Sequence, residues 1–287
     1  MRLSDALESF LLQIQADGRS PHTVAQYRRH VRLFGSFVGT DRELSAITVG
    51  DLAKFLTSSA ALGVVTKPKR PTSVNALRTS LRCFFKHAHE AAIAPTNPAR
   101  LLRLARCMPP PPRSLSNDEV QRLRDVLALA EGPSARRDRA LIEVMLRTGL
   151  RLGSALALDR TDVDLERGEI QVRTAKNQAP ERVFVSRELH EHLIGYLAER
   201  PEGPLFTNRA GERVGTRHVQ RRIEQWMAKT GVRPGMSAHS CRHFFGMSLY
   251  RKTRDLPLVQ AALKHRSIAS TLTYARASED ELRQAIG

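Results

Sequence analysis

The stretch HSCRH at residues 239–243 decides how the second half of the chain is interpreted. It places His239 and Arg242 three positions apart, so a helix that begins here holds both side chains on neighbouring parts of one face. The apolar spacing of residues 241–252 predicts that helix. The stretch therefore brings an imidazole close to a guanidinium that does not give up its proton in proteins.

Other reactive side chains flank this stretch. Lys264 and His265 follow it, and Tyr274 stands nine residues beyond His265. Upstream, a helical pattern over about residues 138–147 ends at Gly149, which acts as a helix stop. The stop lets the chain present Arg151 away from the helix that has just ended.

These residues, in this order, resemble the tyrosine recombinases, also called the integrase family. TGLR at 148–151 matches the first signature of that family, and HSCRH matches four of the five positions of its H-x-L-R-H signature. LKH at 263–265, followed by Tyr274, matches the third signature except for a glycine. Lys176, on a predicted β-hairpin, corresponds to the lysine that completes the family's set. The resemblance covers essentially the whole chain, and the positions together are far more specific than any one motif.

The resemblance implies a site-specific DNA recombinase that serves integration, excision or resolution of DNA. In that family a tyrosine attacks a DNA phosphodiester and leaves a 3′-phosphotyrosine and a free 5′-hydroxyl, so a second strand can reverse the step without ATP. The catalytic residues that it implies here are Arg151, Lys176, His239, Arg242, His265 and Tyr274.

The residue types suit that reaction. Arg151 and Arg242 can bind the non-bridging phosphate oxygens through permanently charged, fork-shaped guanidiniums. The Tyr274 hydroxyl has a reference pKa of about 10 and needs a base, for which His239 is the better candidate because an arginine keeps its proton. Lys176 can protonate the leaving 5′ oxygen, and the two histidines of the set can also hydrogen-bond the phosphate. No cofactor and no metal ion is expected, because the arginines hold the charge.

Three positions depart from the family's pattern. Ser154 stands where an acid is frequent, which affects the tuning of the site more than its activity. Cys241 replaces a leucine and is expected to contact the core. Lys264 replaces the glycine that usually precedes the histidine, either as a DNA contact or as a relaxed turn.

The chain is predicted to form two domains joined by a linker. Residues 1–108 show four apolar stripes at helical spacing and are interpreted as an α-helical core-binding domain for DNA. Residues 109–113 begin with four prolines, which cannot continue a helix and favour an extended spacer. Residues 114–287 are interpreted as the catalytic domain. That domain is predicted to be mixed α+β, with a small antiparallel sheet built on a hairpin of residues 169–173 and 182–185.

The composition favours a polyanionic partner. The chain of 287 residues contains 46 Lys and Arg against 29 Asp and Glu, a formal net charge of +17 that both predicted domains share. A field of that sign attracts polyanions, and with the resemblance the expected partner is double-stranded DNA. No apolar run approaches the ~20 residues of a membrane span, so no membrane partner is expected. The three widely spaced cysteines suggest neither a disulfide framework nor a zinc site, and the expected location is the cytoplasm.

Two charged clusters have simpler explanations. Asp159, Asp162, Asp164 and Glu166 could suggest a metal cluster, and the last three resemble the start of an EF-hand loop. Arg167 occupies the loop position that requires glycine, so a solvated turn is expected. Lys67, Lys69 and Arg70 could meet phosphates or lie in a flexible loop.

Two other functions are open at this point. A type IB topoisomerase uses similar tyrosine chemistry but relaxes supercoils without exchanging partners; the H-x-x-R-H form and the small helical domain favour the recombinase. A DNA-binding regulator with a decayed site is disfavoured by the complete set of catalytic residue types. Within the family, the short chain implies a simple, Xer-like or mobile-element enzyme without a separate arm-binding domain.

The last residues suggest an assembly element. Ser278 and Glu281 match a capping box, and the residues after them offer a small apolar stripe. A helix this short must dock to persist. The family implies docking onto a neighbouring subunit in a homotetramer on two DNA sites, and docking onto its own domain is the alternative. The free protein is therefore expected to be largely monomeric and to assemble on DNA.

Overall fold

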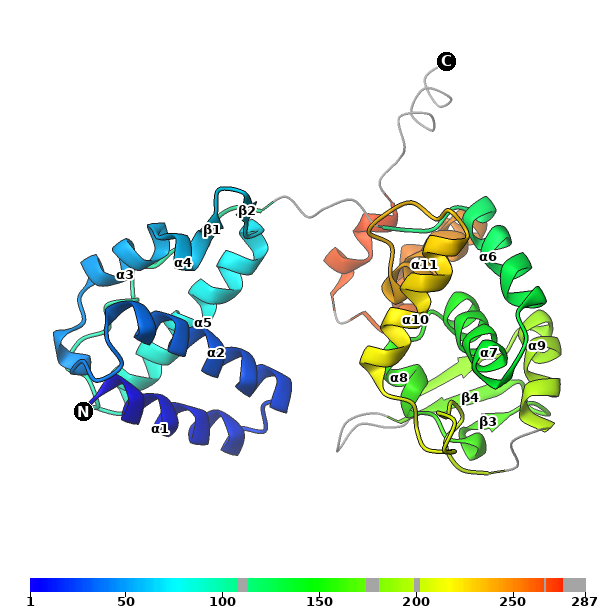
Figure 1. The fold of residues 1–287 in the computed structure, drawn as a ribbon, viewed down its shortest axis with the longest axis horizontal. Coiled ribbons are helices and arrows are strands. Elements are labelled where there is room, and N and C mark those ends of the chain that lie inside the picture. Colours follow the sequence, from blue (N-terminus) through cyan, green and yellow to red (C-terminus); the bar gives the residue numbers. More distant parts are fainter. Residues whose placement is uncertain (108–112, 174–180, 199–201, 266, 276–287) are drawn as a thin grey trace, which may run out of the picture. The chain divides into compact units, whose positions relative to one another are not determined.

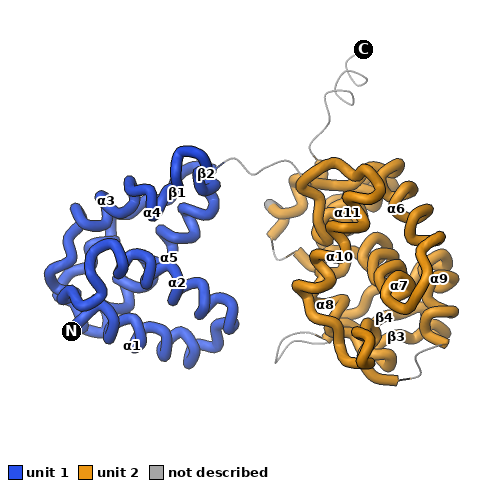
Figure 2. Tube along the Cα trace, viewed as in Figure 1, with its two compact units in different colours: residues 1–109 blue, residues 110–287 orange. Residues whose placement is uncertain are grey.

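The computed structural model describes residues 1–107, 113–173, 181–198, 202–265 and 267–275 (Figure 1). The chain divides into two compact units, Met1–Pro109 and Pro110–Gly287 (Figure 2). Lys176, residues 109–112 of the predicted linker and the predicted helix after residue 278 lie outside the described residues.

Unit 1 is helical, as its apolar stripes predict. Its longer helices are α1 (Leu3–Ala16), α2 (Pro21–Val38), α3 (Val49–Thr57) and α5 (Pro71–Glu90), with a 3-10 turn η1 (Leu44–Ala46). A serine caps α2 ahead of its first-turn proline, and a capping box opens α3. Aromatic rings fill the space between the helices, where Phe34 meets Phe55 and Phe85 edge-on at 5.2 and 5.8 Å between ring centroids.

A short helix and a two-stranded ribbon precede α5, in a region where no element was predicted. The helix is α4 (Ser59–Leu62), and the ribbon pairs β1 (Gly63–Val64) with β2 (Lys67–Pro68) in antiparallel fashion. Gly63 has a φ of +85°, and a Cβ there would lie 2.6 Å from the carbonyl oxygen of Lys67. Only glycine permits so close a turn. Lys67 therefore lies in the ribbon itself, and Lys69 and Arg70 follow it directly.

Unit 2 is built around α7 (Pro133–Thr148), of which eleven residues are buried. This helix runs through the middle of the unit and contacts α6 (Asn117–Leu129), α8 (Leu152–Ala157), α9 (Arg187–Ala198), α10 (Thr216–Lys229) and α11 (Ala238–Thr253) (Figure 1). The helix α12 (Leu256–Leu263) and the 3-10 turn η4 (Leu272–Tyr274) pack on α11, and η3 (Ile268–Ser270) lies against α12.

Because α7 is buried on several sides, its charged residues need partners inside the unit. The carboxylate of Asp138 accepts hydrogen bonds from Arg137 at 2.7 Å, from Arg222 at 2.8 Å and from the indole of Trp226 at 2.9 Å. Removing one member of such a buried network leaves another charge or donor without a partner. The network therefore ties α10, which holds Arg222 and Trp226, to the central helix.

The sheet of unit 2 has three antiparallel strands in the order β3-β4-β5. They are β3 (Val163–Asp164), β4 (Glu169–Val172) and β5 (Glu181–Phe184), and Ile170 lies opposite both Val163 and Val183. The predicted hairpin is confirmed, and its tip at residues 174–180 lies outside the described residues.

The expected solvated turn before this sheet is wrong in part. A 3-10 turn, η2 (Arg160–Asp162), leads directly into β3. The carboxylate of Asp159 pairs with Arg173 at 2.6 Å and also with Arg213, and Asp162 pairs with Arg173 at 3.3 Å. These acids therefore neutralise arginines at the sheet edge instead of facing water alone.

Candidate active site

The helix α11 contains the HSCRH stretch, residues 239–243, directly after its first residue, Ala238. Ser237 and Ser240 form a reciprocal capping box at its N-terminus, so the helix starts immediately before His239. His239 and His243 are four residues apart and lie one turn above the other, with ring centroids 4.7 Å apart and edge-on. Arg242 lies between them in sequence, on the adjoining face.

Arg242 is buried, with 4% of its surface exposed, and its guanidinium is held by two backbone carbonyls. One Nη atom donates to the carbonyl oxygen of Gly149 at 2.6 Å, and the other donates to the carbonyl oxygen of Leu263. Gly149 is the C-cap that follows α7, and Leu263 is the last residue of α12. The TGLR and LKH motifs thus provide acceptors that orient the arginine of HSCRH. Burial, followed by the nearby charge of Arg151, lowers the pKa of Arg242 to about 10.

Gly149 ends α7 in the left-handed region, at a φ of +68°. A Cβ at this position would lie 2.5 Å from the ring of Phe245 and 2.9 Å from the side chain of Leu263. The predicted helix stop is confirmed, and the close contacts show why glycine occupies it. Two residues later Arg151 forms the N-cap of α8 with extended backbone, and its side chain is exposed.

Arg151, His239 and Arg242 line one cavity of about 220 Å³. Gln220 and Glu224 of α10 line it as well. Burial, then Arg242, then Arg151 lower the pKa of His239, so the histidine lies within the field of both guanidiniums. The cavity therefore concentrates positive charge around a space that an anionic group can enter.

Tyr274 stands on η4, against α11, and only 2% of its surface is exposed. Its hydroxyl lies 3.0 Å from Nδ1 of His243. Gly246 makes the approach possible, because a Cβ there would lie 2.8 Å from Cζ of the tyrosine. Burial raises the pKa of Tyr274, while the charge of Arg242 opposes this effect.

The ring of His265 stacks with the tyrosine ring, with centroids 6.3 Å apart and planes 10° apart. Its Nδ1 lies 3.0 Å from the hydroxyl of Thr271. Burial, followed by the charges of Arg242 and Arg151, lowers the pKa of His265 to about 4. The residue before it, Lys264, is in the left-handed region with a φ of +51°. That conformation explains why a glycine is usual here, and it agrees with a turn that a lysine adopts at some cost.

Five of the six predicted site residues thus come together around α11, from the ends of α7 and α12, from η4 and from α11 itself. The sixth, Lys176, lies outside the described residues. Cys241 is fully buried in the core, as expected, and burial raises the pKa of its thiol to about 12. The sequence analysis missed His243 as a partner of the tyrosine. Its only signal was its place in the H-x-x-R-H stretch, four residues after His239.

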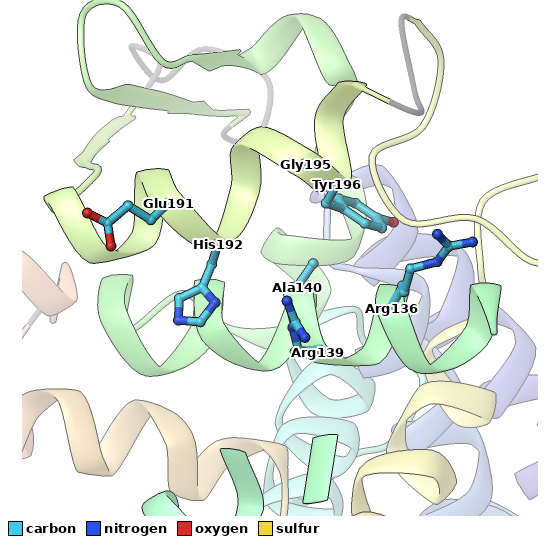
Figure 3. Close-up of a pocket in the computed structure, with 7 residues that line it drawn as sticks. All are labelled: Arg136, Arg139, Ala140, Glu191, His192, Gly195 and Tyr196. Carbon is cyan, nitrogen blue, oxygen red and sulfur yellow. The ribbon is translucent and has the colours of Figure 1, made fainter. Parts of the chain in front are cut away.

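A second cavity, of about 270 Å³, lies between α7 and α9 (Figure 3). His192 and Tyr196 reach it from α9, while Arg136 and Arg139 reach it from α7. Two of its polar groups already serve the packing of the unit: the hydroxyl of Tyr196 donates to the carbonyl of Leu205, and His192 lies 3.9 Å from the buried carboxylate of Glu143. This cavity therefore lies in the packing interface between α7 and α9 and is not part of the site around Tyr274.

Among the residues that the structure describes, His, Cys, Asp and Glu side chains form no group of three that could hold a metal ion. No helix in the described ranges is both long and apolar enough to cross a membrane.

The chain matches two family models: "Phage integrase family" over residues 113–281 and "Phage integrase, N-terminal SAM-like domain" over residues 7–92. A tyrosine recombinase XerC of Chromobacterium violaceum is 30% identical over 276 residues, covering 95% of this chain and 90% of that protein. A tyrosine recombinase XerC of Vibrio atlanticus is 33% identical over 223 residues, covering 75% of this chain and 71% of that protein.

Solved structures share the fold. The XerH site-specific recombinase bound to a palindromic difH substrate superposes with a TM-score of 0.76 at 24% identity, covering 92% of this chain and 78% of that one. The Tn1549 transposon integrase in complex with circular intermediate DNA gives a TM-score of 0.79 at 17% identity, covering 100% of this chain and 99% of that one. The predicted fold class, a helical N-terminal domain followed by a mixed domain with a small antiparallel sheet, is confirmed.

Proposed function

The chain belongs to the phage integrase family, and from this premise we propose that it is a site-specific DNA recombinase that cleaves and rejoins DNA through Tyr274. The observation that supports this most directly is the set of polar side chains around Tyr274. Arg242 is held beside it by two backbone carbonyls, and His243 and His265 contact its hydroxyl and its ring. A tyrosine in the core for packing alone would not need these polar neighbours.

In the proposed reaction, Arg151 and Arg242 bind the non-bridging oxygens of the scissile phosphate. Both are cationic at any working pH, and a guanidinium matches two phosphate oxygens at once. Because the guanidinium of Arg242 is fixed before DNA arrives, little reorganisation is needed when charge builds up on the phosphate. His239 lines the same cavity and adds a hydrogen bond to the phosphate, and His265 adds another.

The leaving group needs a proton as well. The 5′ oxygen of the departing strand would otherwise leave as an alkoxide, which is unfavourable at neutral pH. Lys176, on the tip between β4 and β5, is proposed as the general acid that protonates it. No metal ion enters this scheme, because the guanidiniums of Arg151 and Arg242 supply the positive charge.

Both units are proposed to bind one DNA duplex. Unit 1 is proposed as the core-binding domain and unit 2 as the catalytic domain, with the proline-rich linker between them. Residues 1–108 hold 16 Lys and Arg against 7 Asp and Glu, and the remainder holds 30 against 22, so both parts attract phosphates. Relatives such as XerH and the lambda integrase dimer have been solved on their DNA sites, which agrees with this arrangement.

We also propose that four copies assemble on two DNA sites through the segment after residue 278. Unit 2 has an apolar groove of about 380 Å³ between β5, α11 and α12, whose apolar lining includes Phe184, Phe245, Leu249 and Leu258. Phe184 is 75% exposed and Leu258 is 44% exposed, so the groove presents apolar side chains to solvent. The apolar stripe of residues 282–286 is the proposed occupant of this groove on the neighbouring subunit.

A suicide substrate, in which the strand beyond a nick is lost after cleavage, tests the proposed activity. The wild-type protein should form a covalent protein–DNA adduct with such a substrate, in EDTA as well as in Mg²⁺. Recombination between two sites should follow with intact substrates. Relaxation of supercoils without recombination would indicate a topoisomerase, and tight site binding without any adduct would indicate a DNA-binding regulator.

A further inference from the structure

We propose that His243, rather than His239, holds the hydroxyl of Tyr274 and takes its proton when the phosphate is attacked. This inference rests on the proposed function, because it assigns a role within the same reaction. Its starting point is the contact of 3.0 Å between Nδ1 of His243 and the tyrosine hydroxyl. That distance is within the hydrogen-bond reach required of a general base.

The surroundings leave the tyrosine hydroxyl little freedom. Gly246, three residues after His243 on the same face of α11, lets the ring pack against the helix backbone. The ring of His265 lies nearly parallel to the tyrosine ring. The ring plane is thus set by α11 and His265, and the hydroxyl is directed to His243. His243 is therefore placed by the same helix that places Arg242, one residue earlier.

His243 is suited to accept this hydrogen bond. Burial, followed by the neighbouring His239, Arg242 and His265, lowers its pKa to about 4. The imidazole is then neutral near pH 7 and, with its proton on Nε2, Nδ1 can accept from the tyrosine. Tyr274 keeps its proton in the free protein because burial raises the pKa of its hydroxyl. The pair is stable and uncharged until DNA binds.

Phosphate binding should raise the proton affinity of His243, which is the change that the reaction needs. The charge of Arg242 disfavours a charged His243, and in the proposed reaction the same guanidinium binds the phosphate. A bound phosphate offsets this charge, and the attack adds further negative charge nearby. The proton affinity of His243 therefore rises when the substrate is in place.

The step balances as follows. The hydroxyl oxygen of Tyr274 forms a bond to phosphorus, and the bond from phosphorus to the 5′ oxygen breaks. The tyrosine proton moves to Nδ1 of His243, and the 5′ oxygen takes a proton from the general acid proposed above. Religation reverses each transfer, so His243 returns the proton to the tyrosine.

His239 has a different place. It lines the cavity shared with Arg151 and Arg242, and its ring meets His243 edge-on at 4.7 Å. In the proposed reaction it binds the phosphate from there, and its ring contact is with His243. The two histidines of α11 thus have different roles in the proposal: His239 binds the phosphate, and His243 binds the hydroxyl of Tyr274.

Single-turnover cleavage of a suicide substrate tests this division with two variants of one residue. In His243→Phe both the acceptor and the base are lost, and cleavage should slow by about 100-fold or more. In His243→Asn an amide oxygen occupies the place of Nδ1, so the hydrogen bond is kept while the base is lost. Its cleavage rate should rise by about tenfold per pH unit, since hydroxide must now remove the proton. His239→Asn is the matched control, which should weaken phosphate binding without producing this pH dependence.

A second substrate separates the base from the acid. In a 5′-bridging phosphorothioate the leaving sulfur departs without a proton, so a defect in the general acid is rescued. The His243 variants should remain slow on this substrate. Rescue of both variants by the phosphorothioate, or rates close to wild type at all pH values, would overturn the proposal. A DNA affinity and a urea midpoint equal to those of the wild type, measured at the pH of the cleavage assay, exclude a folding defect in the variants. If the wild-type protein forms no adduct at all, the proposed function itself fails and not the role of His243.

Discussion

Replacing Gly149 by alanine tests how the helix end beneath the site is built. Alanine at a φ of +68° is strained, because its Cβ approaches the following carbonyl oxygen, and this lowers the free energy of unfolding by about 1–2 kcal/mol. The Cβ would also lie 2.5 Å from the ring of Phe245 and 2.9 Å from Leu263, and overpacking of this kind costs about 1–3 kcal/mol. The free energy of unfolding of unit 2 should therefore fall by about 2–5 kcal/mol.

The assay can follow unit 2 alone. Trp226 is the single tryptophan of the chain, and it is buried in unit 2 against the central helix. Its fluorescence during urea unfolding therefore reports the stability of this unit without a signal from unit 1. With a slope of about 1–3 kcal/mol per molar urea, the expected loss moves the midpoint by about 1 M or more.

Gly153→Ala is the matched control. Gly153 lies inside α8, has no atom within 4 Å of an added Cβ and is not in the left-handed region. Alanine is favoured over glycine inside a helix by about 0.5–1 kcal/mol, so this variant should be as stable as the wild type or more so. If Gly149→Ala and Gly153→Ala unfold at the same urea concentration, the left-handed helix end and its contacts do not contribute as argued.

Four further predictions follow from the site and the charge. Tyr274→Phe should bind DNA but form no covalent adduct on a denaturing gel; an adduct from this variant would place the nucleophile elsewhere. DNA affinity should fall steeply with salt, by about 0.9 in log K per log salt for each neutralised phosphate, and a flat titration would mean that the positive charge faces away from DNA. Burial lowers the pKa of His243 to about 4, below its ordinary value of about 6.5, so the unfolded chain binds a proton at a higher pH than the folded chain does. The free energy of unfolding should therefore fall as the pH drops between these two values. In His243→Asn the urea midpoint should fall less over this pH range, and an identical fall would contradict the burial of a neutral imidazole. Deleting residues 278–287 should spare binding to a single site but weaken pairing of sites, whereas normal recombination by the truncated protein would argue against docking onto a neighbour.

The usual glycine before the site histidine is a smaller test of the same reasoning. Lys264→Gly should raise the free energy of unfolding of unit 2 by about 0.5–1 kcal/mol, because lysine is strained at a φ of +51°. Trp226 fluorescence in urea measures it as well. A loss of stability on this substitution would mean that the side chain of Lys264 contributes more than its backbone costs.

The sequence by itself determined the class of fold, and it indicated which residues to expect at the site. Local patterns were enough for this, because helix spacing, a glycine stop and alternating strands depend on neighbours in the chain. The pairing of β4 with β5 and the end of α7 at Gly149 followed from such patterns, and the helical pattern of residues 241–252 lies within α11. The resemblance of three short motifs then gave the order of the catalytic residues.

Only the tertiary structure decided how these residues work on one another. Arg242 is oriented by carbonyls that lie 93 and 21 residues away in the chain, and His243 meets a tyrosine 31 residues away. No periodicity records such contacts, because they depend on how α7, α11, α12 and η4 pack together. For that reason the sequence favoured His239 as the partner of the nucleophile, whereas the packing of Tyr274 against Gly246 directs its hydroxyl to His243.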